Sequence, residues 1–300
     1  MTIDAAAALP PGRRMLAGNF LPVGIVVAVI VVIWYIAALP MNAVVAAPKI
    51  DAGAGVLDAA RISWSLDRPV LPAPHQVLAE LFTTVFTVAP TVPKSLLFHA
   101  WVTLSSTVVG FLMGTILGVL LAVAIVHVTT LNKSLMPWII ASQTIPILAV
   151  APMVIVVLGS VGFVGLLPKS IISTYLCFFP VTIGMVKGLT SPDRMLIDLM
   201  RTYNANSAQV LWKLRWPASL PFLFASLKVA IAIALVGAIV GELPTGAQAG
   251  IGARLLTGSY YGQTIQIWAA LFVAAIMAAA LVSGVGAAER VAARRMGGER

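Results

Sequence analysis

The chain has 300 residues, of which 60% are hydrophobic and only 10% are charged, and it carries a formal net charge of +9 with a mean hydropathy of +1.01. A typical soluble domain is about 45–50% apolar and about 25% charged, so this chain could not cover the surface of a soluble protein with polar groups. The composition excludes a soluble enzyme, a disordered chain and a disulfide-stapled secreted domain. It indicates an all-α, polytopic membrane helix bundle.

Six apolar segments are each long enough to cross a bilayer as a helix, which takes about 20 residues. They cover residues 20–39, 100–126, 135–158, 163–186, 223–243 and 265–288. No convincing small-residue cleavage site closes the first one, so we interpret it as a membrane helix rather than a signal peptide. The expected organisation is a cytoplasmic tail at 1–19, a first transmembrane helix at 20–39, an extracytoplasmic connection at 40–99, a core membrane domain at 100–290 and a cytoplasmic tail at 291–300.

The distribution of lysine and arginine predicts the orientation. With the N-terminus in the cytoplasm, thirteen of the 19 basic residues fall in inner segments, which is the bias that cytoplasmic loops show. The basic residues left in outer segments are Lys49, Arg61, Arg68, Lys94, Lys169 and Arg254. We therefore expect both termini in the cytoplasm and an even number of spans, and this accounts for the net charge without nucleic-acid binding.

The outer connection 40–99 contains turns rich in Gly, Pro and Asp. It then reaches a short stretch, 75–86, in which apolar residues recur at helical spacing: Val77, Leu78, Leu81, Phe82 and Val85. This spacing predicts an amphipathic helix lying on the membrane surface.

Small residues mark one face of the second span. Gly110, Gly114 and Gly118 recur every fourth residue, which allows another helix backbone to approach closely. Packing within one subunit is the favoured interpretation over a dimer seam. The single cysteine, Cys177, excludes an intrachain disulfide and is interpreted as a small packing residue.

The third span is interrupted by proline, which removes a backbone donor and kinks a helix. Its prolines are Pro137, Pro146 and Pro152. Between them lie Ser142, Gln143 and Thr144. A Gln amide is costly against lipid, so Gln143 is expected to face protein or a water-filled path. Helix packing and contact with a transported solute remain equal alternatives.

Glu242 is the acid placed at the edge of a hydrophobic span, where ionisable residues are candidates for function. The alternative is that it already lies in headgroup water, just before Leu243 and Pro244. A proton relay usually needs several buried acids or histidines, which weakens a proton-coupled mechanism. No phosphate-binding glycine loop, catalytic constellation or metal-ligand spacing is present, so the chain is not expected to be an enzyme or to need a cofactor.

The loop 187–222 between two spans is predicted to contain two helices. Apolar residues at 196, 199, 200 and 203 have helical spacing. Residues 204–207 then form a turn, and Ser207 can cap a second helix over 209–216 that Pro217 ends. Such a projecting pair of helices is a docking element whose movement would be passed to the attached spans.

This loop resembles the cytoplasmic EAA loop of permease subunits from binding-protein-dependent ABC importers, whose pattern is Glu-Ala-Ala, three residues, Gly, nine residues, Ile-x-Leu-Pro. Residues 198–200 stand at Glu-Ala-Ala, Asn204 at Gly and residues 214–217 at the last four positions. Asn in place of Gly is a mild change because Asn also tolerates a left-handed backbone. Further similar segments are 71–78, 99–111, 145–152, 217–221 and 237–242, the last two pointing to the nitrate/sulfonate/taurine branch.

The resemblance implies a permease subunit of the bacterial inner membrane that works with a second, identical or different, permease subunit. Two cytoplasmic ATPase subunits would dock on the 187–222 loop and hydrolyse ATP, and an extracytoplasmic binding protein would deliver the solute. The residues expected to contact the ATPase are Asp198, Arg201, Tyr203, Asn204, Gln209 and Lys213. Those expected along the solute path are Ser142, Gln143, Thr144 and Glu242.

The substrate implied by the branch is a sulfonate-, nitrate- or taurine-like anion, with a pyrimidine-type heterocycle as the alternative. No buried Arg or Lys is expected in the path, which argues slightly against a tightly held anion. A stand-alone secondary transporter or channel is the alternative of a different class, and it would need more charged residues within the membrane.

Overall fold

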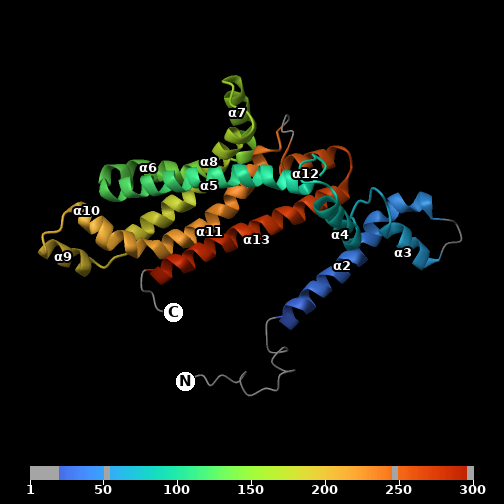
Figure 1. Cartoon of the computed structure of the whole chain (residues 1–300), viewed down its shortest axis with the longest axis horizontal. Helices are drawn as coiled ribbons and strands as arrows, with labels where there is room; N and C mark the ends of the chain where they lie inside the picture. Colours follow the sequence, from blue (N-terminus) through green and yellow to red (C-terminus); the bar gives the residue numbers. More distant parts are fainter. Residues whose placement is uncertain (1–19, 51–54, 245–248, 296–300) are drawn as a thin grey trace, which may run out of the picture. The chain divides into compact units, whose positions relative to one another are not determined.

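The computed structural model describes residues 20–50, 55–244 and 249–295, and this part of the chain forms helices and turns without a β-strand (Figure 1). The longer helices are α2 (Phe20–Ala46), α3 (Val56–Trp64), α4 (Pro74–Phe82), α5 (Leu96–His127), α6 (Thr129–Ser142), α7 (Ile147–Ser160), α8 (Leu166–Leu189), α9 (Arg194–Thr202), α11 (Trp216–Gly241), α12 (Ile251–Tyr260) and α13 (Thr264–Arg295). The all-α fold predicted from composition is confirmed. The helices form two compact units, which are described separately.

The first unit contains the described residues up to Thr83 together with Gly258–Ala269. Its α2 continues through Pro40, and Asn42 on that helix is buried. The Asn42 amide donates to the Leu71 carbonyl at 2.8 Å, and its oxygen accepts from the Val70 amide at 2.8 Å. One side chain thus holds the connection between α3 and α4 against α2.

The amphipathic helix expected over residues 75–86 is present as α4, which continues as a π-helical turn over Thr83–Thr87. Val77 is buried in the first unit, whereas Leu78 and Phe82 are exposed. The apolar residues of the predicted helix therefore do not form one buried face, and its position on a membrane surface stays a prediction.

The second unit contains the described residues within 84–257 and from Ala270 onward, and it is built on α5, α8 and α11. The glycine face of α5 lies against α8: a β-carbon at Gly110 would fall 2.7 Å from the Ser170 carbonyl oxygen, and one at Gly118 would fall 2.8 Å from that of Phe178. Packing of this face within one subunit is confirmed. Later residues of α5 meet later residues of α8, so the two helices are parallel.

Helix α11 packs against α8 in the opposite direction. Gly188 near the end of α8 meets Ser219 near the start of α11, whereas Gly237 near the end of α11 meets Ser173 near the start of α8. The starts of α5 and α8 therefore share one end of the second unit with the end of α11. The loop from α8 to α11, which carries α9, lies at the other end.

Because α5 and α8 are parallel, the chain must return along the unit between them. It does so through α6 and α7, which are bent by 98° at a break before Ile147 (Figure 1). The sequence predicts one kinked span over 135–158; the structure instead breaks it, with Pro146 as the N-cap of α7. The described residues thus contain five helices long and apolar enough to cross a membrane, or six if the bent pair counts as one span.

Candidate functional site

The 187–222 loop begins with α9, which has a well-formed N-terminus. Asp193 is the N-cap, and its side chain accepts from the Met195 amide at 3.0 Å. The apolar residues that predict this helix are not buried. Leu196, Leu199 and Tyr203 are 45%, 50% and 77% exposed, so α9 presents an uncovered apolar face.

The turn after α9 confirms the expectation for Asn204. Its φ is +51°, which is the left-handed region that Asn tolerates better than most residues. Its amide also donates to the Arg201 carbonyl at 2.8 Å. The residue at the Gly position of the resembling loop thus adopts a backbone conformation that glycine also reaches freely.

Two details of the second helix of the loop differ from the prediction. Asn206, not Ser207, is the N-cap of α10 (Ser207–Val210), and it exchanges hydrogen bonds with Gln209 in a capping box. Pro217 does not end the helix either. A π-helical turn over Leu211–Arg215 precedes it, and Pro217 then occupies the first turn of α11, where a missing N–H costs no helical hydrogen bond.

The structure brings all six predicted ATPase-contact residues onto this one projecting segment. Each of them is exposed: Asp198, Arg201, Tyr203, Asn204, Gln209 and Lys213. Arg201 donates to Asp198 at 3.0 Å along α9. Since the segment joins α8 directly to α11, any force applied to it acts on two of the three packed helices.

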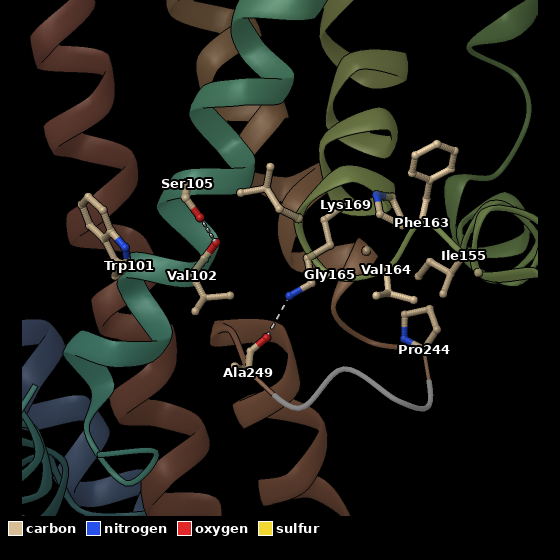
Figure 2. A pocket seen from close by; sticks show the side chains of 14 residues that line it. Trp101, Val102, Ser105, Ile155, Phe163, Val164, Gly165, Lys169, Pro244 and Ala249 are labelled. Carbon is tan, nitrogen blue, oxygen red and sulfur yellow. Dashed lines mark hydrogen bonds between the residues drawn. The ribbon is translucent and has the colours of Figure 1, made fainter. Parts of the chain in front are cut away.

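A cavity of about 730 Å³ lies at the opposite end of the second unit. Figure 2 shows Trp101 and Val102 of α5 on one side of it, and Ile155 of α7 with Phe163 and Val164 on the other. Pro244 and Ala249, between α11 and α12, also line it. The walls are therefore mostly apolar.

Lys169 is the charged residue among the described residues that line this cavity. It is only 8% exposed, and its Nζ donates to the Ala249 carbonyl at 2.9 Å and lies 3.5 Å from Glu242 Oε1 (Figure 2 shows the first contact). The expectation that no Lys or Arg is buried here is wrong. The helix begins at Leu166, so Lys169 lies in its first turn rather than in an outer loop.

Glu242 is fully buried, which overturns its placement in headgroup water. Its carboxylate accepts from the Thr103 hydroxyl and from the Gly252 amide, each at 2.9 Å. The two backbone amides before Gly252 are hydrogen-bonded as well. The Ile251 amide donates to Thr103 Oγ1 at 2.8 Å, and the Gly250 amide donates to His99 Nδ1 at 3.0 Å. Three consecutive amides before and at the start of α12 are thereby fixed to α5 and to the end of α11.

The other residues predicted for the solute path lie elsewhere. Ser142 ends α6 half-buried, and its carbonyl accepts from the Tyr175 hydroxyl, whereas Gln143 and Thr144 are exposed. None of these three is among the described residues lining the cavity, and Glu242 lies behind Lys169 rather than on the lining. Sequence reasoning missed Lys169, although a lysine within the apolar segment 163–186 was a usable signal.

Comparison with known proteins gives a consistent result. Residues 114–298 match the family described as "Binding-protein-dependent transport system inner membrane component". The chain is 30% identical to a probable ABC transporter permease protein of Haemophilus influenzae, over 68% of this chain and 78% of that protein. It is 29% identical to the formylaminopyrimidine transport permease protein ThiX of Halalkalibacterium halodurans, over 64% and 74%. It is 26% identical to the putative aliphatic sulfonates transport permease protein SsuC of Bacillus subtilis, over 92% and 91%.

Proposed function

The chain belongs to the family of inner membrane components of binding-protein-dependent transport systems, as a permease subunit of an ABC transporter, and from this we propose that it forms half of an ATP-driven importer. In this proposal the chain carries out no chemistry itself. It supplies helices around a solute path and a contact through which ATP binding and hydrolysis by partner ATPases change that path.

The exposed apolar face of α9 is the observation that carries the proposal. Leu199 and Tyr203 are at least half exposed on a helix outside the long spans, and their exposure favours a covering partner. Asp198 and Arg201 on the same helix, with Asn204, Gln209 and Lys213 next to it, supply polar contacts around that face. We propose that two ATPase subunits dock on this segment and on its counterpart in a second permease subunit.

The orientation follows from this contact. If the ATPases are cytoplasmic, α9 is on the cytoplasmic side and the cavity faces outward, where a binding protein would deliver the solute. With α6 and α7 counted as one broken span, both termini are cytoplasmic, and the residues 1–19 and 291–300 are cytoplasmic tails of a protein in the bacterial inner membrane. Residues 40–99 are then extracytoplasmic and 100–290 form the core.

We propose that the solute is a small sulfonate-, nitrate- or taurine-like anion or a pyrimidine-type heterocycle. Relatives named for sulfonates and for formylaminopyrimidine support this range. The path would pass the cavity near Glu242 and the break between α6 and α7, where Ser142, Gln143 and Thr144 lie.

The test is uptake in proteoliposomes that contain the chain with and without its co-purifying ATPase. Isolation of the tagged chain from its own membranes should retain an ABC ATPase, and accumulation of solute should require that ATPase and internal ATP. Uphill accumulation by the chain alone would contradict the proposal and favour a stand-alone secondary transporter.

A further inference from the structure

We infer that the cavity at the start of α8 is a binding site for an organic oxyanion, in which Lys169 contacts the solute and Glu242 positions Lys169. The expected ligand has a carboxylate or sulfonate head and an apolar body. The inference rests on the proposed function, because it takes the cavity to be part of the solute path.

The size and the walls of the cavity suit an organic molecule rather than a bare inorganic ion. A volume of about 730 Å³ lies within the range of small-molecule sites, roughly 300–1,000 Å³. Its walls include Trp101, Val102, Ile155, Phe163 and Val164, which offer aromatic and aliphatic surface. A nitrate ion would leave that surface uncovered, whereas an aromatic or aliphatic body would bury it.

The ammonium of Lys169 indicates that the head group of the ligand carries an oxygen that accepts a hydrogen bond. One of its three N–H donors is used by the Ala249 carbonyl, and the Glu242 carboxylate lies 3.5 Å away as an ion pair, so these two contacts leave at least one N–H donor. A ligand oxygen can accept from this donor. A charge-assisted hydrogen bond of this kind is stronger than a neutral one, and the apolar walls reduce screening by water.

The position of Glu242 determines the sign of the electrostatic potential that a ligand meets in the cavity. The carboxylate lies behind the ammonium and is not among the described lining residues. Its negative charge is also met by the Thr103 hydroxyl and the Gly252 amide. A ligand in the cavity therefore meets the positive side of the pair, so an oxyanion is attracted and an organic cation is repelled.

Glu242 further fixes where that ammonium lies. Its carboxylate accepts from the Gly252 amide, and three residues earlier the Ala249 carbonyl accepts from the Lys169 ammonium. A β-carbon at Gly250, whose φ is +126°, would overlap the Glu242 carboxylate, so this close approach requires glycine. The ammonium is thus held by the Ala249 carbonyl and the Glu242 carboxylate, on a residue that lines the cavity.

The test is binding of naphthalene-2-sulfonate to the full chain in nanodiscs of phosphatidylcholine, measured by calorimetry beside the uncharged probe methyl 2-naphthyl sulfone. The double variant Lys169→Gln/Glu242→Gln removes both charges with little change of shape. It should bind the sulfonate about tenfold more weakly and the sulfone within about twofold of the parent. Lys169→Arg should keep sulfonate binding within about threefold, because the charge and donors remain.

Lys94→Gln is the matched control, since Lys94 is exposed just before α5 and does not line the cavity. It should leave both affinities unchanged. Equal binding of sulfonate and sulfone by the parent chain, or equal sulfonate binding by the parent and the double variant, would overturn the inference.

A phospholipid headgroup presents the same oxyanion chemistry, so a second arm separates the two sources. Adding phosphatidylglycerol to the nanodiscs should leave sulfonate affinity within about twofold. Competition by this lipid, with lipid retained by the parent and lost from the double variant in native mass spectrometry, would assign the site to lipid and overturn the inference. If ATP-dependent uptake persists although the sulfonate does not bind in the cavity, the further inference is wrong and the proposed function still stands.

Discussion

The Lys169 ammonium of α8 and the carboxylate of Glu242, the C-cap of α11, lie 3.5 Å apart, with side chains only 10% and 0% exposed. A pair so far from water is costly to break, because removing one partner leaves the other buried without compensation. Removing both partners together leaves no such charge. The pair should therefore show strong coupling in a double-mutant cycle.

We predict that Glu242→Gln destabilises the chain by about 3 kcal/mol and that adding Lys169→Gln recovers at least about half of this loss. Thermal unfolding in detergent, followed by tryptophan fluorescence, gives both values. The exposed pair Asp198 and Arg201 is the control, and its neutralisation should cost less than about 0.5 kcal/mol. Additive effects of the two buried substitutions would show that the groups do not interact.

The contact between Gly114 of α5 and Cys177 of α8 gives a second stability prediction. A β-carbon at Gly114 would overlap the Cys177 sulfur and lie 3.1 Å from the Thr174 carbonyl oxygen. Gly114→Ala should therefore cost about 1–3 kcal/mol, despite the better helix propensity of alanine.

Removing the sulfur tests the cause. Cys177→Ala in the Gly114→Ala background should restore most of the lost stability, measured as the same unfolding transition. Gly284→Ala on α13 is the matched control, since a β-carbon there meets nothing within 4 Å, and it should not destabilise. If Cys177→Ala gives no recovery, the overlap is not the source of the loss.

Features determined by short-range sequence patterns were predictable. The glycine face of α5 can be predicted from a four-residue repeat alone. The left-handed conformation of Asn204 can be predicted from its residue type and its place in a turn. The helix around Pro217 was predicted wrongly, because the rule that proline ends a helix omits the case in which proline enters a new first turn after a π-helical widening.

The Lys169–Glu242 network was not predictable in the same way. Its partners come from α5, α8, the end of α11 and the start of α12, so they meet only after the helices pack. Charge counting also grouped Lys169 with the outer basic residues although the predicted span 163–186 contains it, so a lysine in the first turn of α8 was not treated as a residue of the membrane core.

The turn at Asn204 should be essential for coupling but not for folding. Asn204→Gly keeps the left-handed backbone and should preserve uptake. Asn204→Pro cannot adopt a φ of +51° and removes the amide that donates to the Arg201 carbonyl, so it should abolish uptake. The measurement is ATP-dependent uptake by the complete transporter, with membrane insertion checked in parallel. Full uptake and full ATPase stimulation in the proline variant would refute this role.

The charge of Arg201 tests whether α9 is a contact surface. Its pair with Asp198 is 75% and 67% exposed, so Arg201→Glu should change the free energy of unfolding by less than about 0.5 kcal/mol. If an ATPase subunit binds α9 through complementary charges, Arg201→Glu places a like charge against that subunit. The variant should then lower solute-stimulated ATP hydrolysis by about tenfold or more.

The charge-swapped variant Asp198→Arg/Arg201→Glu separates the two possible roles of this pair. It restores the attraction along α9 but leaves both charges reversed toward a partner, so we expect it to remain uncoupled. Reconstituted transporter with matched amounts of ATPase provides the measurement, and uptake should fall together with stimulated hydrolysis. Recovery of coupling in the swapped variant would mean that the pair acts within α9, and the docking role of these two side chains would then be wrong.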